Sequence, residues 1–405
     1  MGGFWVFSAV VIVILSILIN SLSLLLVGTL LLLFVLVSKW WADYSLQRVV
    51  YKHQLNANRV FSGEEVQLTT QTTNNKFLPL PWIQINDELP KEVSARQGRV
   101  VASTDPTRMA LTSVLSMSWY HRTTRTYDIR CPNRGHFFIG PTRIRSGDLF
   151  GMHTREMRVE KDQTLTVYPR ILPLRVSSLP SLEPYGDVRV KRRFLDDVTR
   201  PMGSRRYLSG DALRHIHWKA TAHTGMLQTR IFEASTTPNF AVFFGTRTIE
   251  PPLQGSRPHL LELGVLTVTA LVNHALSRRI PAGVYVNQTS RDSRQNMEVP
   301  PARHPDQLVK VLEVMAHVHP EESTPLANLI EEKSRSLPWS TTILVATAIP
   351  DQATINTLMR MRKAGWTTAL IHVGGEAVEY AREGIARYTV ANTTAWQSLE
   401  EIVIQ

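Results

Sequence analysis

The segment RRYLSGDALRHIHWKATAHTGMLQTRIFE, residues Arg205–Glu233, is the most distinctive part of this 405-residue chain. It gathers arginine, lysine, histidine and tryptophan around two glycines, and only Asp211 and Glu233 oppose its positive charge. Such a concentration of special residues indicates a shared role. We consider two roles for the segment: a structural connection between domains, and a basic surface that binds an acidic partner.

The middle of the segment predicts a short helix. Asp211 is suited to cap the N-terminus of that helix and Gly225 to end it. On the helix Arg214 and Trp218, four residues apart, would share one face, so that the guanidinium could lie over the indole.

A structural role would place the apolar side chains of Ile216, Trp218 and Leu227 between two domains. Arg214 would then pair with a buried carboxylate, for which Asp211 is a candidate. In a binding role, five cationic side chains would form a docking surface for an acidic partner: Arg205, Arg206, Lys219, His223 and Arg230. The two roles are compatible on different faces of the segment.

The histidines raise the alternatives of metal binding and catalysis. On a helix His215 and His217 point in different directions, which argues against a two-histidine metal site, whereas on a strand they would share a face. A hydrolase that uses Asp211 and His217 is the least favoured alternative. These two residues are too close in sequence for a triad without special geometry, and the chain has no nucleophile elbow and no HExxH motif.

The N-terminus of the chain is strongly apolar. No charged residue lies between Phe4 and Val37, a run of about 51 Å as one helix against a hydrocarbon core of about 30 Å. Its most polar point is Asn20–Ser23. We therefore predict a hairpin of two transmembrane helices, near Phe4–Ile19 and Leu22–Trp41, in a membrane domain of residues 1–41. One long, tilted helix is the alternative.

Basic residues that follow the apolar run predict its orientation: Lys39, Arg48, Lys52 and Arg59. They place the downstream domains, and in the hairpin also the N-terminus, on the cytoplasmic side of an inner or plasma membrane. A signal peptide is not expected, because no basic region precedes the run and the run is too long. The balance of 45 basic and 34 acidic residues, net +11, fits this orientation signal and also fits an anionic partner.

Residues 50–170 predict an antiparallel β-sandwich of the immunoglobulin-like kind. The alternation from Val66 to Thr72 and from Tyr127 to Cys131 is typical of strands with one buried face, and Pro132–Gly135 is a turn sequence. Cys131 is the single cysteine, so the chain cannot form an intrachain disulfide framework. We interpret it as a small core residue rather than a reactive thiol.

Residues 171–235 are expected to be a connecting segment that contains the opening block, and residues 236–405 an α/β domain. The apolar runs Phe240–Phe244 and Thr342–Ala346 predict strands buried on both faces. Further strands are expected at Gly283–Val286 and Thr367–Val373, and helices at His259–Leu276, Gln307–Val318, Asp351–Lys363 and Thr394–Ile402. This alternation predicts a mostly parallel sheet covered by helices on both faces.

The opening block resembles the central signature of the bacterial and archaeal family known as domain of unknown function 58. The residues that carry the resemblance are Tyr207, Gly210, Asp211, Arg214, Ile216, Trp218 and Gly225. Pro79–Trp82, Gly147–Gly151 and Val167–Arg170 are similar to other landmarks of that family. The resemblance implies a von Willebrand factor A-like C-terminal region and association with cytoplasmic MoxR-type AAA+ ATPases. It implies no catalytic activity and no cofactor.

Many von Willebrand factor A domains bind a divalent metal through an Asp-x-Ser-x-Ser motif after the first strand. In this chain the corresponding stretch contains Gly245, Arg247 and Glu250, and the aspartate and both serines of the motif are missing. Hard cations require oxygen ligands, usually carboxylates, and Arg247 adds positive charge instead. We therefore expect no metal ion at this position.

The sequence thus predicts a membrane-anchored, non-catalytic scaffold or adaptor that acts with a MoxR-type ATPase in the assembly or maturation of protein complexes. Its expected partners are the lipid bilayer, that ATPase, and subunits that the sequence does not identify. The alternative is a membrane protein that binds a polyanion or nucleic acid, with an affinity that falls steeply with salt. Because the chain has no nucleic-acid recognition motif, we do not expect a nucleic-acid partner.

Overall fold

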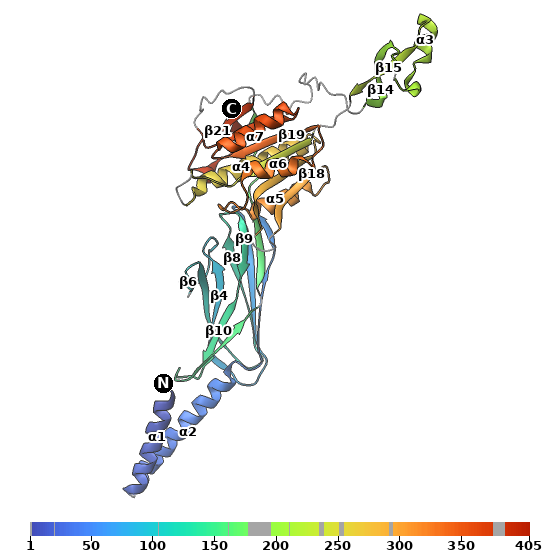
Figure 1. Cartoon of the computed structure of the whole chain (residues 1–405). Helices are drawn as coiled ribbons and strands as arrows, with labels where there is room; N and C mark the ends of the chain where they lie inside the picture. The colour runs from blue at the N-terminus through green and yellow to red at the C-terminus, as the bar shows by residue number, and fades with distance from the viewer. Residues whose placement is uncertain are drawn as a thin grey trace. The chain divides into compact units, whose positions relative to one another are not determined.

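The chain folds into two compact units, Met1–Arg170 with Met315–His317 and Ile171–Val314 with Val318–Gln405 (Figure 1). The computed structural model describes residues 2–19, 21–103, 105–160, 162–176, 196–209, 211–234, 239–250, 255–290, 295–375 and 385–405. The division after Arg170 coincides with the end of the predicted sandwich. Residues 171–235, the predicted connecting segment, do not form a unit of their own, because they belong to the second unit.

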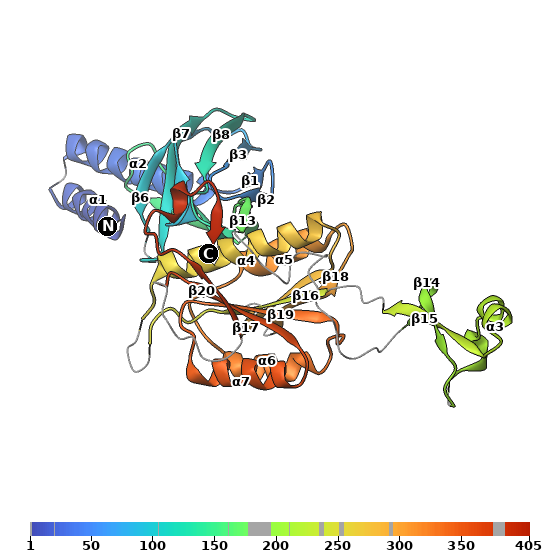
Figure 2. The ribbon, with the colours of Figure 1, turned by 90° about the horizontal axis from the view of Figure 1, so that it is seen from above.

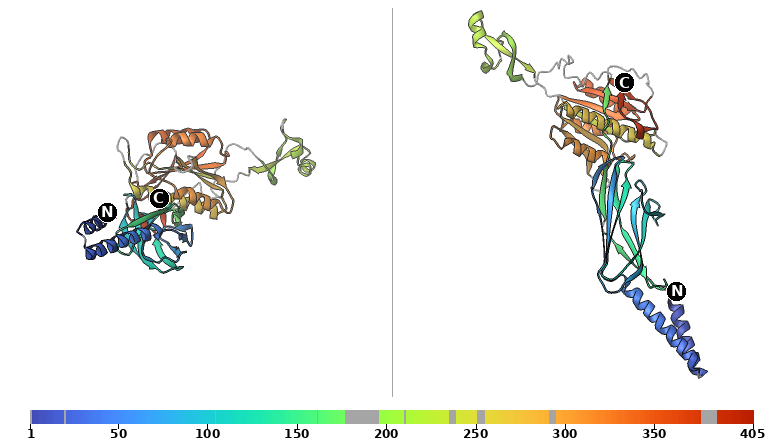
Figure 3. Two further views of the ribbon diagram at one scale, coloured as in Figure 1. Left: turned by 90° about the horizontal axis from the view of Figure 1, so that it is seen from below. Right: turned by 180° about the vertical axis from the view of Figure 1, so that it is seen from behind.

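The first unit begins with two apolar helices that lie side by side, α1 (Gly2–Leu18) and α2 (Leu22–Ser45) (Figures 1 and 3). The predicted break near Asn20 is confirmed, and α2 continues beyond the predicted end at Trp41. Gly28 of α2 is buried, and a Cβ at this position would lie 3.0 Å from Cγ2 of Val13. Its missing side chain therefore allows α1 to approach α2 closely.

By length and composition, α2 could cross a membrane, and 17% of its most apolar stretch is buried. The helix α4 (Pro258–Ser277) passes the same test but is 72% buried, as expected for the core helix of a domain. The shorter apolar stretch Val6–Leu18 lies in α1. These properties distinguish the N-terminal helices, whose apolar side chains are largely exposed, from the buried helix α4.

The rest of the first unit consists of short strands in three sheets. One sheet has the order β1-β3-β8-β5, the second β11-β10-β4-β7-β6 and the third β2-β12-β9. The strands are β1 (Val49–Leu55), β2 (Arg59–Phe61), β3 (Glu65–Asn74), β4 (Leu80–Pro90), β5 (Ser94–Ala95), β6 (Arg99–Ala102), β7 (Arg108–Met117), β8 (Arg122–Arg130), β9 (Gly135–Ile139), β10 (Thr142–Gly147), β11 (Thr154–Val159) and β12 (Gln163–Tyr168). Neighbouring strands pair antiparallel except β2 and β12, so the expected antiparallel, sandwich-like architecture is confirmed.

The core of these sheets follows the period-two pattern of the sequence. β1 alternates strictly between buried and exposed residues, and Val66, Leu68 and Ile129 are fully buried. Cys131 is also fully buried in this core, as predicted. Burial raises the pKa of its thiol to about 11, which keeps the group in the neutral, unreactive form at neutral pH.

The second unit contains a six-stranded sheet of order β18-β17-β16-β19-β20-β21. Its strands are β16 (Asn239–Gly245), β17 (Ala282–Thr289), β18 (Asn296–Ala302), β19 (Thr341–Thr347), β20 (Thr367–Val373) and β21 (Ala386–Val390). Only β17 and β18 pair antiparallel in this sheet, and the other neighbours pair parallel. The central strand β16 is buried from Phe240 to Gly245, which explains its continuous apolar run.

Helices lie on both faces of this sheet, with α4 and α5 (Gln307–Ala316) on one face and α6 (Leu326–Ser334) and α7 (Gln352–Lys363) on the other (Figure 2). Asp351 caps α7 by accepting a hydrogen bond from the backbone N–H of Thr354 at 3.0 Å. Gly365 follows this helix with a φ of 100°, a conformation that favours glycine. Both ends of α7 therefore obey the local signals in the sequence.

The predicted C-terminal helix at Thr394–Ile402 is wrong. This region contains a single 3₁₀ turn, η2 (Trp396–Ser398), followed by the strand β22 (Ile402–Ile404). β22 pairs parallel with β13 (Leu174–Val176), more than two hundred residues earlier, and buries Ile402 and Ile404. Pairing with a distant strand outweighs the weak helical preference of so short a segment.

Candidate functional site

The segment that dominates the sequence folds as a β-hairpin with a helical insert, which we name the basic hairpin. Its strands are β14 (Asp196–Arg206) and β15 (Gln228–Ala234), and its helical turns are η1 (Leu213–His215) and α3 (Trp218–Thr224) (Figure 1). The strands pair antiparallel, with Arg205 opposite Thr229. Beyond the strands, the backbone N–H of Tyr207 donates to the carbonyl of Leu227 at 2.9 Å and closes the base of the insert.

A bidentate ion pair fixes the start of the insert. The two terminal guanidinium nitrogens of Arg205 donate to the two carboxylate oxygens of Asp211 at 2.8 and 2.7 Å. The same carboxylate accepts from the backbone N–H of Leu208 at 3.0 Å and from the hydroxyl of Thr229 at 3.3 Å. The Arg205 guanidinium, followed by the Leu208 N–H, lowers the pKa of Asp211 to about 2.

The expected N-cap at Asp211 is therefore wrong. The helix begins later, at Trp218, and its N-cap is His217, whose Nδ1 accepts a hydrogen bond from the N–H of Ala220 at 3.0 Å. Asp211 instead closes the preceding turn, in which its own N–H donates to the carbonyl of Leu208 at 3.0 Å. The predicted stop at Gly225 is confirmed, because this residue forms the left-handed C-cap with a φ of 66°.

The expected contacts of Arg214 are also wrong. Arg214 lies in η1 rather than on α3, so the four-residue spacing to Trp218 does not place both on one helical face. Its Nε lies 3.2 Å from Nε2 of His215, and Arg205 takes the carboxylate of Asp211. Because Asp211 and the Nδ1 of His217 both have structural partners, their arrangement does not support the hydrolase alternative.

Burial separates the signature residues into two groups. Ile216 is 5% exposed and pairs with Thr229 in an isolated bridge, so it is the apolar centre of the hairpin. Trp218 is 68% exposed and Leu227 46%, so neither side chain is packed within the hairpin itself. Tyr207 is half-buried, and its hydroxyl donates to the carbonyl of Asp211 at 3.3 Å. Gly210 lies outside the described residues.

The surface of the basic hairpin combines positive charge with apolar side chains. Of the five predicted docking residues, Arg206, Lys219, His223 and Arg230 are exposed, whereas Arg205 is partly buried against Asp211. Five large apolar side chains form an exposed apolar set on this surface: Leu208, Leu213, Trp218, Met226 and Leu227. The sequence interpretation missed Leu208, Leu213 and Met226. The sequence does contain a signal for these residues: large apolar side chains lie between charged ones and follow neither a helical nor a strand periodicity.

The position of the von Willebrand factor A metal motif holds a different arrangement. The guanidinium of Arg247 forms an ion pair with Glu322. The hydroxyl of Thr246 donates to the side-chain oxygen of Asn287 at 3.0 Å and is also 2.8 Å from the carbonyl of Glu321. These residues do not fit a hard cation, since the guanidinium neutralises the nearby carboxylate. In the described part of the chain, no group of three or more His, Cys, Asp or Glu side chains could hold a metal ion.

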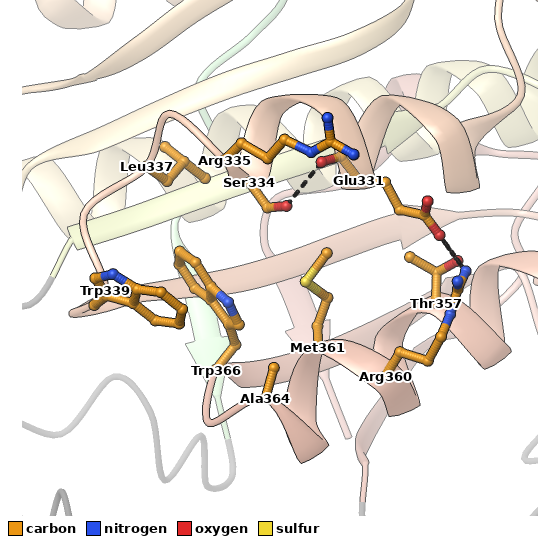
Figure 4. A pocket seen from close by; sticks show the side chains of 10 residues that line it. All are labelled: Glu331, Ser334, Arg335, Leu337, Trp339, Thr357, Arg360, Met361, Ala364 and Trp366. Carbon is orange, nitrogen blue, oxygen red and sulfur yellow. Dashed lines mark hydrogen bonds and ion pairs between the residues drawn. The ribbon is translucent and has the colours of Figure 1, made fainter. Parts of the chain in front are cut away.

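Described residues of the α/β region line pockets in different parts of that region. One of about 380 Å³ lies at the carboxyl ends of parallel strands. There Nε2 of His372 donates a hydrogen bond to the carbonyl of Ala348 at 3.1 Å, and burial lowers the pKa of that histidine. Another, of about 530 Å³, lies beside α6 and α7 (Figure 4). Its Trp339 and Trp366 rings stack at 5.1 Å, and Glu331 accepts from Thr357 and Arg360, so these polar groups bind one another.

Comparison with known proteins gives a distant relative. The uncharacterized protein YeaD of Bacillus subtilis is 23% identical over 309 residues, which cover 74% of this chain and 70% of that protein. No family model matches the chain. Among solved structures, the CARDB domain of a Pyrococcus furiosus protein and a cohesin module of Clostridium perfringens cover 29% and 30% of this chain, and 91% and 98% of their own chains. Their identities are 6% and 9% and their TM-scores 0.20 and 0.21, which are too low to carry an argument.

Proposed function

We propose that this chain is a membrane-anchored, non-catalytic scaffold of the domain of unknown function 58 family, and that it acts with a MoxR-type AAA+ ATPase in the assembly or maturation of protein complexes. The apolar helices α1 and α2 would anchor it in an inner or plasma membrane. The basic residues that follow the apolar run, Lys39 and Arg48 among them, support a cytoplasmic position of the domains. A cytoplasmic ATPase could reach the protein only in this orientation.

The α/β region supports the family proposal through its topology. The mostly parallel sheet has β16 at its centre and helices on both faces. This arrangement is compatible with a von Willebrand factor A-like domain. The pair between Arg247 and Glu322 in place of the metal motif favours binding that does not require a divalent ion. We therefore propose that this domain serves as a structural platform.

The observation that carries the docking proposal is the surface of the basic hairpin. Trp218 and Lys219 are both exposed on α3, and Arg206 and Arg230 lie exposed on the two paired strands. Protein interfaces are typically anchored by tryptophan and arginine, surrounded by a polar rim. A partner that fits this surface has an apolar depression bordered by carboxylates. Phosphate groups alone would not require the exposed apolar set, so the surface favours an acidic protein over a polyanion.

The test measures binding of a purified MoxR-type ATPase from the same organism to the full-length protein in lipid nanodiscs. We expect Trp218→Ala and Lys219→Glu each to weaken binding, Trp218→Ala by roughly thirtyfold, because truncating an interface tryptophan typically costs about 2 kcal/mol. Trp339→Ala and Lys310→Glu are matched controls, since both residues are exposed on the α/β region.

Three outcomes would contradict the proposal. Equal loss of binding in the Trp339 and Lys310 controls would show that the basic hairpin is not the docking site. Failure of the unaltered protein to bind the ATPase would remove this partner. Retention on heparin with a steep salt dependence, together with no ATPase binding, would favour the polyanion alternative.

A further inference from the structure

One end of the β-sandwich contacts the second half of α2. The rings of Phe34 on α2 and Phe150 on the β10–β11 loop lie 5.0 Å apart. Farther along α2, the hydroxyl of Ser38 lies 3.3 Å from Nδ1 of His153, and Asp43 accepts a hydrogen bond from Nε of Arg155 at 2.8 Å. These contacts fix the β10–β11 loop beside the apolar part of the helix.

The β10–β11 loop presents apolar side chains outward and holds its polar groups inward. Leu149 is 65% exposed and Phe150 63%. The carboxylate of Asp148 is buried, where it accepts from the backbone N–H of Phe150 at 3.2 Å and of His153 at 2.7 Å. The indole N–H of Trp82 donates to the carbonyl of Asp148 at 2.9 Å. The loop therefore has a defined conformation with two large apolar side chains at its tip.

The depth of this tip follows from its neighbour on α2. Phe34 precedes Lys39, the first charged residue after the apolar run, by five positions. At about 1.5 Å per residue, Phe34 lies roughly 7 Å closer to the middle of a membrane than Lys39, if α2 is perpendicular to it. The aromatic residues Trp40 and Trp41 follow Lys39 and are suited to the interface. A side chain that contacts Phe34 would thus lie at the edge of the hydrocarbon core.

Two further loops at the same end of the sandwich also expose aromatic rings. The buried ammonium of Lys76 donates to the carbonyls of Ser45 at 2.6 Å and Gln47 at 2.9 Å, which ties the β3–β4 loop to the end of α2. Next to it, the rings of Phe77 and Trp119 stack at 5.2 Å. The exposed fractions are 71% for Phe77, 57% for Trp119 and 69% for Tyr120. Stacked aromatic side chains in water expose apolar area that a partner would normally cover.

We propose that these three loops form a lipid-binding surface, with Leu149 and Phe150 among the outer acyl chains and Phe77, Trp119 and Tyr120 at the level of the headgroups. This inference rests on the proposed membrane anchoring by α2. The contact between Phe34 and Phe150 identifies the bilayer as the occupant, because any lipid around Phe34 also surrounds the loop beside it. The surface would hold the sandwich against the membrane and restrict its motion about the end of α2.

Site-directed spin labelling of the full-length protein in phosphatidylcholine–phosphatidylglycerol vesicles tests the proposal. Nitroxides are introduced one at a time through Phe150→Cys, Leu149→Cys, Trp119→Cys, Leu30→Cys and Val101→Cys. The native Cys131 is fully buried, so the labelled positions are the introduced ones, and unaltered protein gives the background. Leu30 is an exposed residue of α2 and Val101 an exposed residue of β6, so they serve as the membrane and water references.

We expect labels at positions 149 and 150 to be relaxed more by oxygen than by a water-soluble nickel chelate, as at position 30, and the label at position 101 to show the reverse. The label at position 119 should lie between the two references. A water-accessible label at position 150, with position 30 immersed in lipid, would overturn the lipid-binding surface alone. A water-accessible label at position 30 would instead overturn the membrane anchoring on which the inference rests. Shielding of position 150 from both reagents would assign the loops to a protein contact and overturn the inference.

Discussion

The guanidinium of Arg205 and the carboxylate of Asp211 form two parallel hydrogen bonds, at 2.8 and 2.7 Å, where the helical insert of the basic hairpin leaves β14. Arg205 comes from the end of β14, and Asp211 follows the turn that leaves that strand. The pair therefore holds the turn against the strand and sets the direction in which the helical insert starts. It makes Arg205 a structural residue, although the sequence grouped it with the docking residues.

Replacing either partner of this pair should loosen the hairpin locally. We expect Asp211→Asn and Arg205→Ala to increase amide exchange at Tyr207, whose N–H donates to Leu227, with little change in the sandwich. Arg206→Ala is the control, since Arg206 is exposed and adjacent. Hydrogen exchange measured by mass spectrometry checks this prediction. Equal exchange in the Asp211 variant and the unaltered protein would show that the pair does not hold the turn.

The same pair predicts a dependence on acid. The folded pKa of Asp211 is about 2, below its ordinary value of 3.8, so the ionised form is favoured by folding. The ion pair therefore contributes fully to the stability of the hairpin above about pH 4, and this contribution is lost as the pH falls from about 4 to 2. Exchange at Tyr207 should therefore increase over this interval in the unaltered protein, beyond the intrinsic effect of pH, and the Asp211→Asn variant should not show that increase.

Replacing Gly225 should destabilise α3 through backbone strain and not through a steric clash. Its φ of 66° is unfavourable for other residues, while a Cβ at this position would meet no atom within 4 Å. We expect Gly225→Ala to destabilise α3 by about 1 kcal/mol, the usual cost of a left-handed conformation for a residue with a Cβ. Gly203→Ala is the matched control, because Gly203 also has open space but no positive φ. Exchange rates in Trp218–Thr224 measure the difference, and equal rates in both variants would contradict it.

Lys76 predicts a coupling between the end of α2 and the sandwich. Its ammonium satisfies the carbonyls of Ser45 and Gln47, so we expect Lys76→Met to destabilise the first unit by about 1–3 kcal/mol, the cost of buried groups left without partners. Lys52→Met, at an exposed position of β1, should have little effect. Urea unfolding of the protein in detergent micelles, followed by intrinsic fluorescence, compares the variants.

The pH dependence of this effect has a defined sign. Burial lowers the pKa of Lys76 to about 8 from its ordinary 10.5, so between these values the unfolded chain binds the proton that the folded protein releases. Stability relative to the Lys76→Met variant should therefore rise as the pH increases from 8 to 10.5. A difference that is constant over this interval would show that the amine remains protonated in the folded protein.

A buried polar cluster in the sandwich predicts how much stability is lost when the hydroxyl of Tyr51 is removed. Asp87 is 3% exposed, and its carboxylate accepts from the hydroxyl of Tyr51 at 2.7 Å and from that of Thr142 at 2.7 Å. Burial, together with the charge of Asp87, raises the pKa of Tyr51, so the phenol remains a donor. We expect Tyr51→Phe to destabilise the sandwich by about 1.5–3 kcal/mol, and Tyr120→Phe, at an exposed position, to have no measurable effect. Thermal unfolding checks both values.

Cys131 provides a test of the sandwich core itself. The thiol is fully buried and its pKa is raised to about 11. We expect no reaction with a maleimide at pH 7 in the folded protein and full reaction in urea. Labelling of the folded protein at the rate of a free thiol would contradict the core position of this residue.

Much of the architecture could be predicted from local patterns. The apolar run with its break near Asn20 predicted α1 and α2, and the period-two alternation from Val66 to Thr72 predicted β3. Asp351 and Gly365 predicted the ends of α7, and Gly225 predicted the end of α3. These signals act within one or two turns of chain, so they do not depend on what the segment packs against.

The candidate site could be predicted only in outline. Of the five cationic residues that the sequence grouped as docking residues, four are exposed, but the sequence assigned Asp211 to a helix cap and to Arg214. Several donors lie near that carboxylate in sequence, and composition does not rank them. The antiparallel pairing of β14 with β15 decides the matter, because it places Arg205 and Thr229 opposite each other and both within reach of Asp211.

The sequence by itself therefore determined which segments are apolar helices, which are half-buried or fully buried strands, and where several of them end. Only the tertiary structure decided which distant residues meet: β13 with β22, Gly28 with Val13, Arg205 with Asp211, and the loops around Phe77, Trp119 and Phe150 at the end of α2. The physical reason is the distance along the chain over which each kind of interaction acts. Local preferences are set by neighbours along the chain, whereas a partner for an ion pair, a strand or an exposed ring is chosen by the pairing and packing of elements far apart in sequence.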